Sequence, residues 1–281
     1  MTLHPCGILY IVATPIGNLG DLSLRAIETL QSADIIACED TRHSKKLLEH
    51  YHIKSPTVSY HEYSDRSSVD KILSHLERNQ SVALISDAGT PLISDPGYRL
   101  VVEARERGID VVPIPGSCAL VAALSVSGLA TDRFSFQGFL PAKKQQRTVT
   151  LKALRGSVST LIFYEAPHRI LATLDDAVAV MGIARNAFMA REITKKYETF
   201  NRGTLGELRE VVALDSQQQR GEIVLIIAGA VDEHDAKYLD AERILAVLLN
   251  ELPPSKAASL ASKITGLSKQ ELYTKALSLA D

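Results

Sequence analysis

The sequence predicts an α/β protein with two α/β domains and a small C-terminal helical module. In the first half, short apolar runs alternate with helical patterns, as in βαβ units around a mostly parallel sheet. A second set of apolar runs begins at Phe134, and the stretch after residue 231 carries helical patterns without apolar strand runs. With 281 residues and 46% hydrophobic content, the chain is long enough for two packed cores.

Apolar runs bounded by turn residues locate the individual strands. The first half predicts strands at residues 7–13, 33–38, 82–86 and 109–114, with helices between them and a further helix at 118–127. A turn at 128–132 separates these from the clearest strands of the second set, at 160–164, 187–193 and 223–228. We place the domains at residues 1–116, 117–231 and 232–281.

The last segment predicts three helices, at residues 240–250, 255–264 and 268–279. We expect Ser255 to cap the second helix, Gly266 to end it, and Ser268 with Glu271 to form a capping box for the third. Two helices joined by a short turn are typical of a helix-turn-helix, which would present Lys269 to a nucleic acid. The alternative is a tail that packs or supports a dimer.

Composition excludes several classes of protein. A net charge of −2 argues against binding by global positive charge. The longest apolar stretches fall short of the roughly 20 residues of a membrane span, and the N-terminus lacks a signal-peptide pattern, so we expect a cytoplasmic protein without a membrane partner. Cysteines 6, 38 and 118 are odd in number and widely spaced, which supports neither a disulfide framework nor a zinc site.

Three loops of small residues follow predicted strands, at residues 14–20, 87–91 and 115–117. The carboxyl ends of parallel strands meet at a crevice where ligands bind, and small residues let a ligand approach the backbone. The first loop lacks the G-x-G-x-x-G fingerprint and the chain lacks a Walker lysine motif. The loops therefore predict a nucleoside pocket without a strong phosphate cradle, although ordinary tight turns are the alternative.

Several longer strings carry a resemblance to a known family. They are YIVATPIGNL at 10–19, CEDTR at 38–42, SDAGTPLISDPG at 86–97, PGS at 115–117, YEAPHR at 164–169, AREITKK at 190–196 and RGE at 220–222. Together they resemble the tetrapyrrole-methylase family of S-adenosylmethionine enzymes over roughly residues 7–230. The first loop departs from the usual G-x-G-P-G type, which favours the RNA-modifying branch of that family.

The resemblance implies 2′-O-methylation of a cytidine in small-subunit (16S) ribosomal RNA, with the free RNA or the assembled subunit as substrate and a homodimer as the enzyme. It also implies a cofactor crevice between the two α/β domains. Two alternatives stay open: a methyltransferase that acts on a tetrapyrrole, and a non-catalytic factor that binds ribosomal RNA.

The same resemblance implies which residues bind S-adenosylmethionine. In the first domain they are Pro15, Asp87, Ala88, Gly89, Ile93, Ser94, Asp95, Pro115, Gly116, Ser117 and Ala119. In the second domain they are Tyr164, Ala190, Arg191, Gly221 and Glu222. Asp87 could accept hydrogen bonds from the ligand's ammonium or ribose, or it could tie down the Ala88-Gly89 turn.

Methyl transfer to a hydroxyl needs alignment and removal of one proton, so catalytic candidates should lie on loops that face the crevice. Glu39 could accept a proton, Arg42 could grip a phosphate, and Lys195 or Lys196 could stabilise an alkoxide. The structural alternatives are that Asp40 caps the next helix, that Arg42 pairs with Glu39, and that the lysines lie on a solvated edge.

A basic stretch at residues 141–156 contains no acidic residue. Its Lys143, Lys144 and Arg147, together with Lys269, are our candidates for RNA phosphate contacts. A solvated helix face is the alternative.

Overall fold

A computed structural model describes residues 7–61, 66–230 and 233–280. Contacts divide the chain into two units, the first of which takes the described residues up to Ala122 together with Glu192–Glu198. The second unit takes the described residues of Ala123–Arg191 and Thr199–Asp281. The predicted boundary at 116/117 stays a prediction, and the boundary at 231/232 lies outside the described residues.

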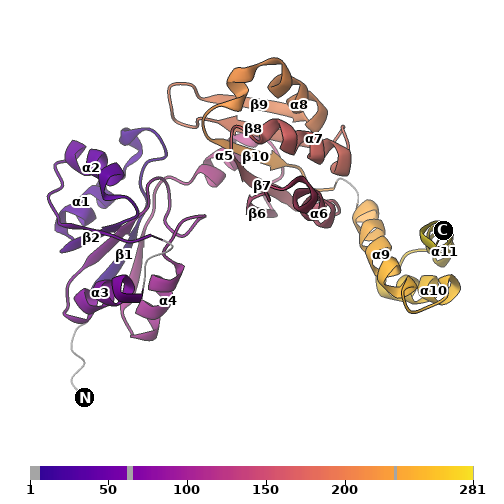
Figure 1. Cartoon of the computed structure of the whole chain (residues 1–281), viewed down its shortest axis with the longest axis horizontal. Coiled ribbons are helices and arrows are strands. Elements are labelled where there is room, and N and C mark those ends of the chain that lie inside the picture. The colour runs from indigo at the N-terminus through magenta and orange to yellow at the C-terminus, as the bar shows by residue number, and fades with distance from the viewer. Residues whose placement is uncertain (1–6, 62–65, 231–232, 281) are drawn as a thin grey trace. The chain divides into compact units, whose positions relative to one another are not determined.

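The first unit contains a five-stranded parallel sheet (Figure 1). Its strand order is β3-β2-β4-β1-β5. The strands are β1 (Ile8–Val12), β2 (Ile35–Cys38), β3 (Thr57–Ser59), β4 (Val82–Ile85) and β5 (Asp110–Ile114). The four predicted strands are confirmed, whereas β3 was missed because its three residues lack an apolar run.

Helices cover both faces of this sheet. Alternate residues of β4 enter different cores, since Val82 and Leu84 pack with one cluster and Ala83 and Ile85 with the other. One cluster includes residues of α1 (Leu24–Ser32) and α2 (Thr41–His50), and the other includes residues of α3 (Arg66–Glu77) and α4 (Tyr98–Glu106). Because all the strands run parallel, their carboxyl ends meet at one edge, where the loops after β1, β2, β4 and β5 lie together.

The second unit contains a mixed sheet of order β6-β7-β10-β8-β9. The strands are β6 (Phe134–Phe139), β7 (Thr160–Glu165), β8 (Asn186–Arg191), β9 (Thr199–Thr204) and β10 (Ile223–Ile227). Only β6 and β7 pair in parallel; the other pairings are antiparallel. The prediction of strand to residue 193 is wrong, because the chain turns out of β8 at Glu192, whose φ is 54°. The polar edge strand β9 was missed.

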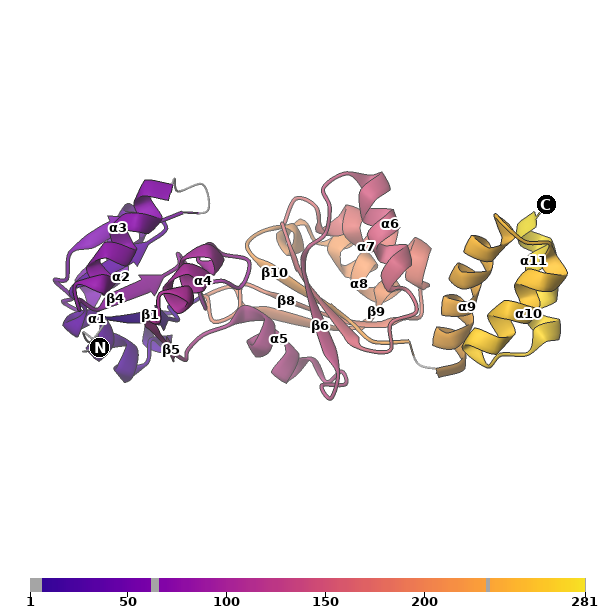
Figure 2. The ribbon, with the colours of Figure 1, turned by 90° about the horizontal axis from the view of Figure 1, so that it is seen from below.

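Helices α6 (Lys144–Leu154), α7 (Ile170–Met181) and α8 (Leu205–Leu214) pack on this sheet (Figure 2). Their core joins Leu151 of α6, Leu174 of α7 and Leu208 of α8 to Phe163 and Leu225 of the sheet. Helix α5 (Ala119–Ser127) and the short helices η1 (Leu19–Asp21) and η2 (Ser216–Gln219) complete the two α/β units.

The chain ends in a three-helix module of α9 (Glu233–Leu249), α10 (Pro254–Thr265) and α11 (Lys269–Ala280). Its core is rich in alanine, which lets the helices approach closely. Gly266 ends α10 with a φ of 75°, as predicted. The expected cap at Ser255 is wrong, because α10 begins at Pro254 after the N-cap Pro253. In the described ranges, no helix is long and apolar enough to cross a membrane.

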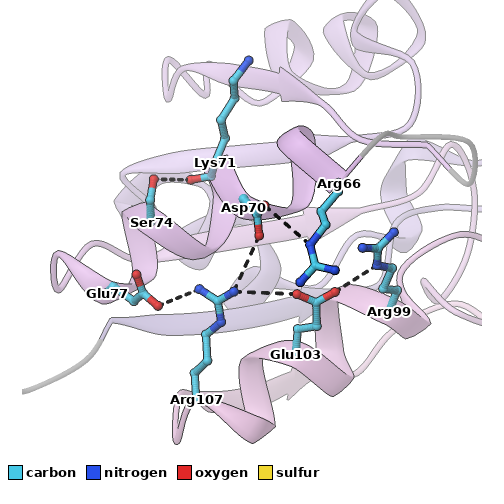
Figure 3. Close-up of polar contacts among 8 residues, drawn as sticks. All are labelled: Arg66, Asp70, Lys71, Ser74, Glu77, Arg99, Glu103 and Arg107. Atoms are coloured by element: carbon cyan, nitrogen blue, oxygen red, sulfur yellow. Dashed lines mark hydrogen bonds and ion pairs between the residues drawn. The ribbon is translucent and has the colours of Figure 1, made fainter.

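An ion-pair network ties α3 to α4 on the surface of the first unit (Figure 3). Arg107 bonds Glu77 of α3 at 2.7 Å and lies 3.6 Å from Asp70 and 3.7 Å from Glu103 of α4. Glu103 in turn binds Arg99 at 2.9 Å. Because single exposed pairs contribute little, the shared network is what can stabilise these helices. The network therefore anchors α4, which begins at Tyr98 immediately after the loop at 86–97.

We expect the Glu103→Gln variant to be less stable than the wild type at neutral pH. The hydrogen bond from Arg99 lowers the pKa of Glu103 below its ordinary value of 4.5. The ionised carboxylate therefore contributes to the free energy of unfolding in full above pH 4.5, and this contribution is lost as the pH falls through the lowered pKa. Thermal unfolding from pH 7 to pH 3 should show the difference between the two proteins shrinking. A difference that stays constant with pH would contradict this account.

Candidate functional site

Three loops at the carboxyl edge of the first sheet interlock through backbone hydrogen bonds. Thr14, after β1, and Gly89, after β4, exchange N–H···O=C bonds of 2.8 and 3.0 Å. The Thr90 hydroxyl then donates to the carbonyl of Ser117, after β5, at 3.0 Å. The loops at 14–20, 86–97 and 115–118 therefore form one connected backbone surface.

Small and buried residues make this close approach of the loops possible. Gly89 is buried with a φ of 82°, a conformation that strains residues other than glycine. A Cβ on Gly116 would lie 2.9 Å from that of Ala13. The buried Thr14 hydroxyl donates to the carbonyl of Ser86 at 3.2 Å, which fixes the start of the β4 loop.

The loop after β4 carries several of the predicted ligand residues. Leu92 and Ser94 have left-handed backbones, with φ of 73° and 64°, and Ile93 and Ser94 are exposed. Burial raises the pKa of Asp95, and the nearby Asp87 raises it further, while a hydrogen bond with Ser86 opposes both. Left-handed non-glycine residues are costly and gather at ligand sites, so these two residues favour the prediction of a ligand loop.

Asp87 connects the β4 loop to the end of β2. Its carboxylate accepts a hydrogen bond from the backbone N–H of Asp40 at 3.3 Å. Asp40 in turn caps α2 by accepting from the N–H of Arg42 at 2.8 Å, a bond that lowers the pKa of Asp40. The capping alternative for Asp40 is confirmed.

The two predicted catalytic residues beside Asp40 lie in different surroundings. Glu39 is half-buried, whereas the side chain of Arg42 is 94% exposed. The Nε of Arg42 lies 3.8 Å from a carboxylate oxygen of Asp40, its neighbour at the start of α2. Arg42 can therefore reach a phosphate in solvent.

The segment Glu192–Glu198 brings Lys195 onto the first loop. The stem of Lys195 lies over Gly17, where a Cβ would come within 2.3 Å of its Cγ. Its Nζ lies 2.9 Å from a carboxylate oxygen of Glu192, and the Thr194 hydroxyl bonds Asp21. Lys196 is exposed and lies 5.6 Å from the centroid of the Tyr197 ring. The two predicted lysines therefore have different surroundings, since Lys195 packs on the first loop and Lys196 is exposed to solvent.

The contacts of Glu192 and Thr194 could not be predicted from the sequence. Thr194 and Asp21 are 173 residues apart, and no local pattern relates them. The left-handed backbones of Glu192 and Thr194, with φ of 54° and 66°, give no compositional signal either, because neither residue is a glycine.

The predicted ligand residues of the second unit gather at one end of its sheet. Tyr164 of β7 and Ala190 of β8 pair with Val224 of β10 from opposite sides. Arg191 is buried and donates to the Thr199 hydroxyl at 3.1 Å and to the Arg220 carbonyl at 3.4 Å. It thereby fixes the turn that holds Gly221, whose φ is 79°, and the exposed Glu222.

The structure corrects one of the four RNA-contact predictions. Lys143, Lys144 and Lys269 are exposed, but Arg147 is buried and bonds Asp176 at 2.7 Å. Its guanidinium is therefore directed into the unit and not toward solvent. Lys269 lines an open cavity of about 360 Å³ in the C-terminal module, together with Ser255, Gln270 and Tyr273.

Comparison with known proteins identifies the family. A model described as Tetrapyrrole (Corrin/Porphyrin) Methylases matches residues 8–209. The chain belongs to this family. A second model, described as RsmI C-terminal HTH domain, matches residues 235–280 and so covers the three-helix module. The family match confirms the predicted fold class.

Relatives of this methylase resemble it over nearly their whole length. "Ribosomal RNA small subunit methyltransferase I" of Pseudomonas aeruginosa is 51% identical over 96% of this chain and 97% of its own. The protein of the same name from Escherichia coli O157:H7 is 49% identical over 96% and 95%. The uroporphyrin-III C-methyltransferase of Thermus thermophilus, solved with S-adenosylhomocysteine, shares the fold at a TM-score of 0.54 and 18% identity, over 79% of this chain and 97% of its own.

We expect the Thr14→Val variant to lose about 1–3 kcal/mol of stability, because the buried carbonyl of Ser86 would lose a hydrogen-bond donor. Urea unfolding measures the change. Ser74→Ala is the control, since it removes an exposed bond to the Lys71 carbonyl in the same unit and should change stability by no more than about 0.5 kcal/mol. Equal losses in the two variants would contradict the structural role of Thr14.

Proposed function

We propose that this methylase transfers the methyl group of S-adenosylmethionine to a cytidine 2′-hydroxyl of small-subunit ribosomal RNA. The observation that carries the proposal is the near-full-length identity of about half with relatives named for methylation of that RNA. The first loop, which departs from the G-x-G-P-G type, supports RNA over a tetrapyrrole as the substrate.

The connected loops of the first unit are the proposed cofactor site. Exposed backbone groups of these loops would hold the amino-acid part and the ribose, while Gly89 and Gly116 allow the loops themselves to pack closely together. Asp87 or Asp95 would accept hydrogen bonds from the ammonium or ribose hydroxyls. Bound there, the cofactor supplies an electrophilic methyl group. The family resemblance assigns further cofactor contacts to Tyr164 and its neighbours in the second unit.

The residues proposed for catalysis act on the acceptor hydroxyl. Glu39 is the proposed proton acceptor, since it is half-buried at the carboxyl end of β2. The ammonium of Lys195, fixed by Glu192 over the first loop, would stabilise negative charge that develops on the oxygen. Lys196 and Arg42, both exposed, would bind phosphates and align the nucleotide.

The remaining parts of the proposal concern assembly and location. Lys143, Lys144 and Lys269 would contact the RNA backbone, and the C-terminal module would extend that contact. The proposed homodimer follows from the family resemblance, and sedimentation of the purified protein tests it. The proposed cytoplasmic location is the one expected from the sequence.

We expect Gly89→Val to abolish detectable cofactor binding. A branched side chain at φ 82° would strain the loop and place its methyl groups near Ile16. Isothermal titration with S-adenosylmethionine measures the effect. Gly108→Val is the matched control, because Gly108 also has a left-handed φ, of 71°, but has open space around it. Retained affinity in the Gly89 variant would refute this pocket.

We expect Lys195→Met to lower kcat by about 100-fold while it leaves the affinity for S-adenosylmethionine unchanged, because it removes charge stabilisation at the acceptor oxygen. Lys196→Met should mainly raise KM for RNA, because that lysine is exposed. Single-turnover kinetics with both variants measures the two effects. If both variants raise KM for RNA by the same factor and neither lowers kcat, the role given to Lys195 is wrong.

Methyl transfer tests the proposed function as a whole. The purified protein is incubated with methyl-labelled S-adenosylmethionine and small ribosomal subunits that lack native methylation, and nuclease mapping locates the label. We expect label at a 2′-O-methylcytidine. Absence of label despite cofactor binding would refute the RNA substrate and favour a tetrapyrrole, and binding of the subunit without S-adenosylmethionine consumption would favour a non-catalytic factor.

A further inference from the structure

The turn at residues 140–143, between β6 and α6, is held from inside the second unit by two arginines. Arg147 of α6 donates to the carbonyl of Ala142 at 3.2 Å. Arg169, which precedes α7, donates to the carbonyl of Leu140. The side chain of Leu140 is itself buried in the core, so the turn is fixed at three points.

Each arginine faces a buried carboxylate. Two nitrogens of Arg147 bond one carboxylate oxygen of Asp176 at 2.7 Å, and the two side chains are only 5% and 7% exposed. The Nε of Arg169 lies 3.2 Å from a carboxylate oxygen of Glu165, whose side chain is fully buried. Glu165 also accepts from the Thr173 hydroxyl at 2.6 Å and from the N–H of Ala166 at 2.8 Å.

Stability alone is a poor explanation for two such pairs beside one short turn. Removing charges from water is costly, and well-packed apolar residues of similar volume often stabilise a protein as well as a buried ion pair does. What an apolar pair cannot do is hold a backbone carbonyl in a fixed place. The arrangement therefore indicates that the position of the turn matters.

The turn leads directly into two exposed lysines. Lys143 is the N-cap of α6 and Lys144 is its first residue. The Nζ of Lys144, whose side chain is 82% exposed, lies 3.9 Å from the second carboxylate oxygen of Asp176. Apart from this contact with Asp176, residues 141–156 themselves contain no acidic residue. Figure 2 shows α6 and α7 packed side by side at this end of the second unit.

We propose that Arg147 and Arg169 are positioning residues, which with Asp176 and Glu165 hold Lys143 and Lys144 in a preset arrangement for two backbone phosphates of the RNA substrate. The fixed turn sets the backbone positions from which both lysine side chains extend, so less conformational freedom is lost on binding and a matching RNA backbone geometry is favoured. This inference rests on the proposed function and assigns Arg147 a role that differs from direct phosphate contact.

The double variant Arg147→Met/Asp176→Leu tests the proposal without a change in net charge. We expect it to fold and to bind S-adenosylmethionine as the wild type does, with kcat unchanged and KM for small-subunit RNA raised on the order of tenfold. The variant also frees Lys144 from Asp176, so an account by charge alone expects KM to stay the same or fall. Unchanged or lowered KM would overturn the proposal.

An exposed ion pair between α7 and α8 provides the matched control. Arg209 bonds Asp175 of α7 at 2.8 Å, and both side chains are about half exposed. The exchange Arg209→Met/Asp175→Leu should leave KM for RNA unchanged, and an equal rise in KM would overturn the proposal. Should the first double variant not fold, Arg147→Lys replaces it: we expect a smaller rise in KM, because lysine keeps the pair but cannot also reach the Ala142 carbonyl.

A double-mutant cycle tests whether the buried pairs act through the lysines. With Lys143→Ala/Lys144→Ala already present, the exchange at Arg147 and Asp176 should change KM by less than twofold. The salt dependence of RNA binding should also weaken when the lysines are removed. A full tenfold effect without the lysines would overturn the positioning role. If the wild-type protein itself transfers no methyl group to small-subunit RNA, the proposed function is wrong, whatever the variants show.

Discussion

The pair of backbone hydrogen bonds between Thr14 and Gly89 is the contact on which the proposed site depends. It exists because β1 and β4 are neighbours in a parallel sheet, so that their carboxyl ends meet although they lie more than 70 residues apart. The bond from Thr90 to Ser117 extends the connection to β5. Without the Thr14–Gly89 pair, the loop after β1 would not be joined to the loops after β4 and β5.

The sequence was sufficient for the parts of the molecule that follow local rules. Apolar runs located β1, β2, β4 and β5, and Asp40 was placed correctly as a possible helix cap. The short strand β3 and the polar edge strand β9 gave no apolar signal and were missed. Ser255 was misplaced as a cap because Pro254 fits the first helical position.

Side-chain environment was harder to predict than secondary structure. Arg147 looked like a phosphate ligand because it lies in a basic stretch, but its partner Asp176 is 29 residues away on another helix. Lys195 and Lys196 are adjacent in sequence, yet only Lys195 lies over Gly17. In both cases a long-range contact determines whether the charged group faces solvent, and neither composition nor local sequence pattern predicts that contact.

The central claim is that the connected loops of the first unit hold the methyl donor. Amide hydrogen exchange with and without S-adenosylmethionine tests it most directly. The account predicts slower exchange in the presence of the cofactor at residues 86–97 and 115–118, with the exposed surfaces of α3 and α11 unchanged. Cofactor binding that leaves both loops unprotected would contradict the account.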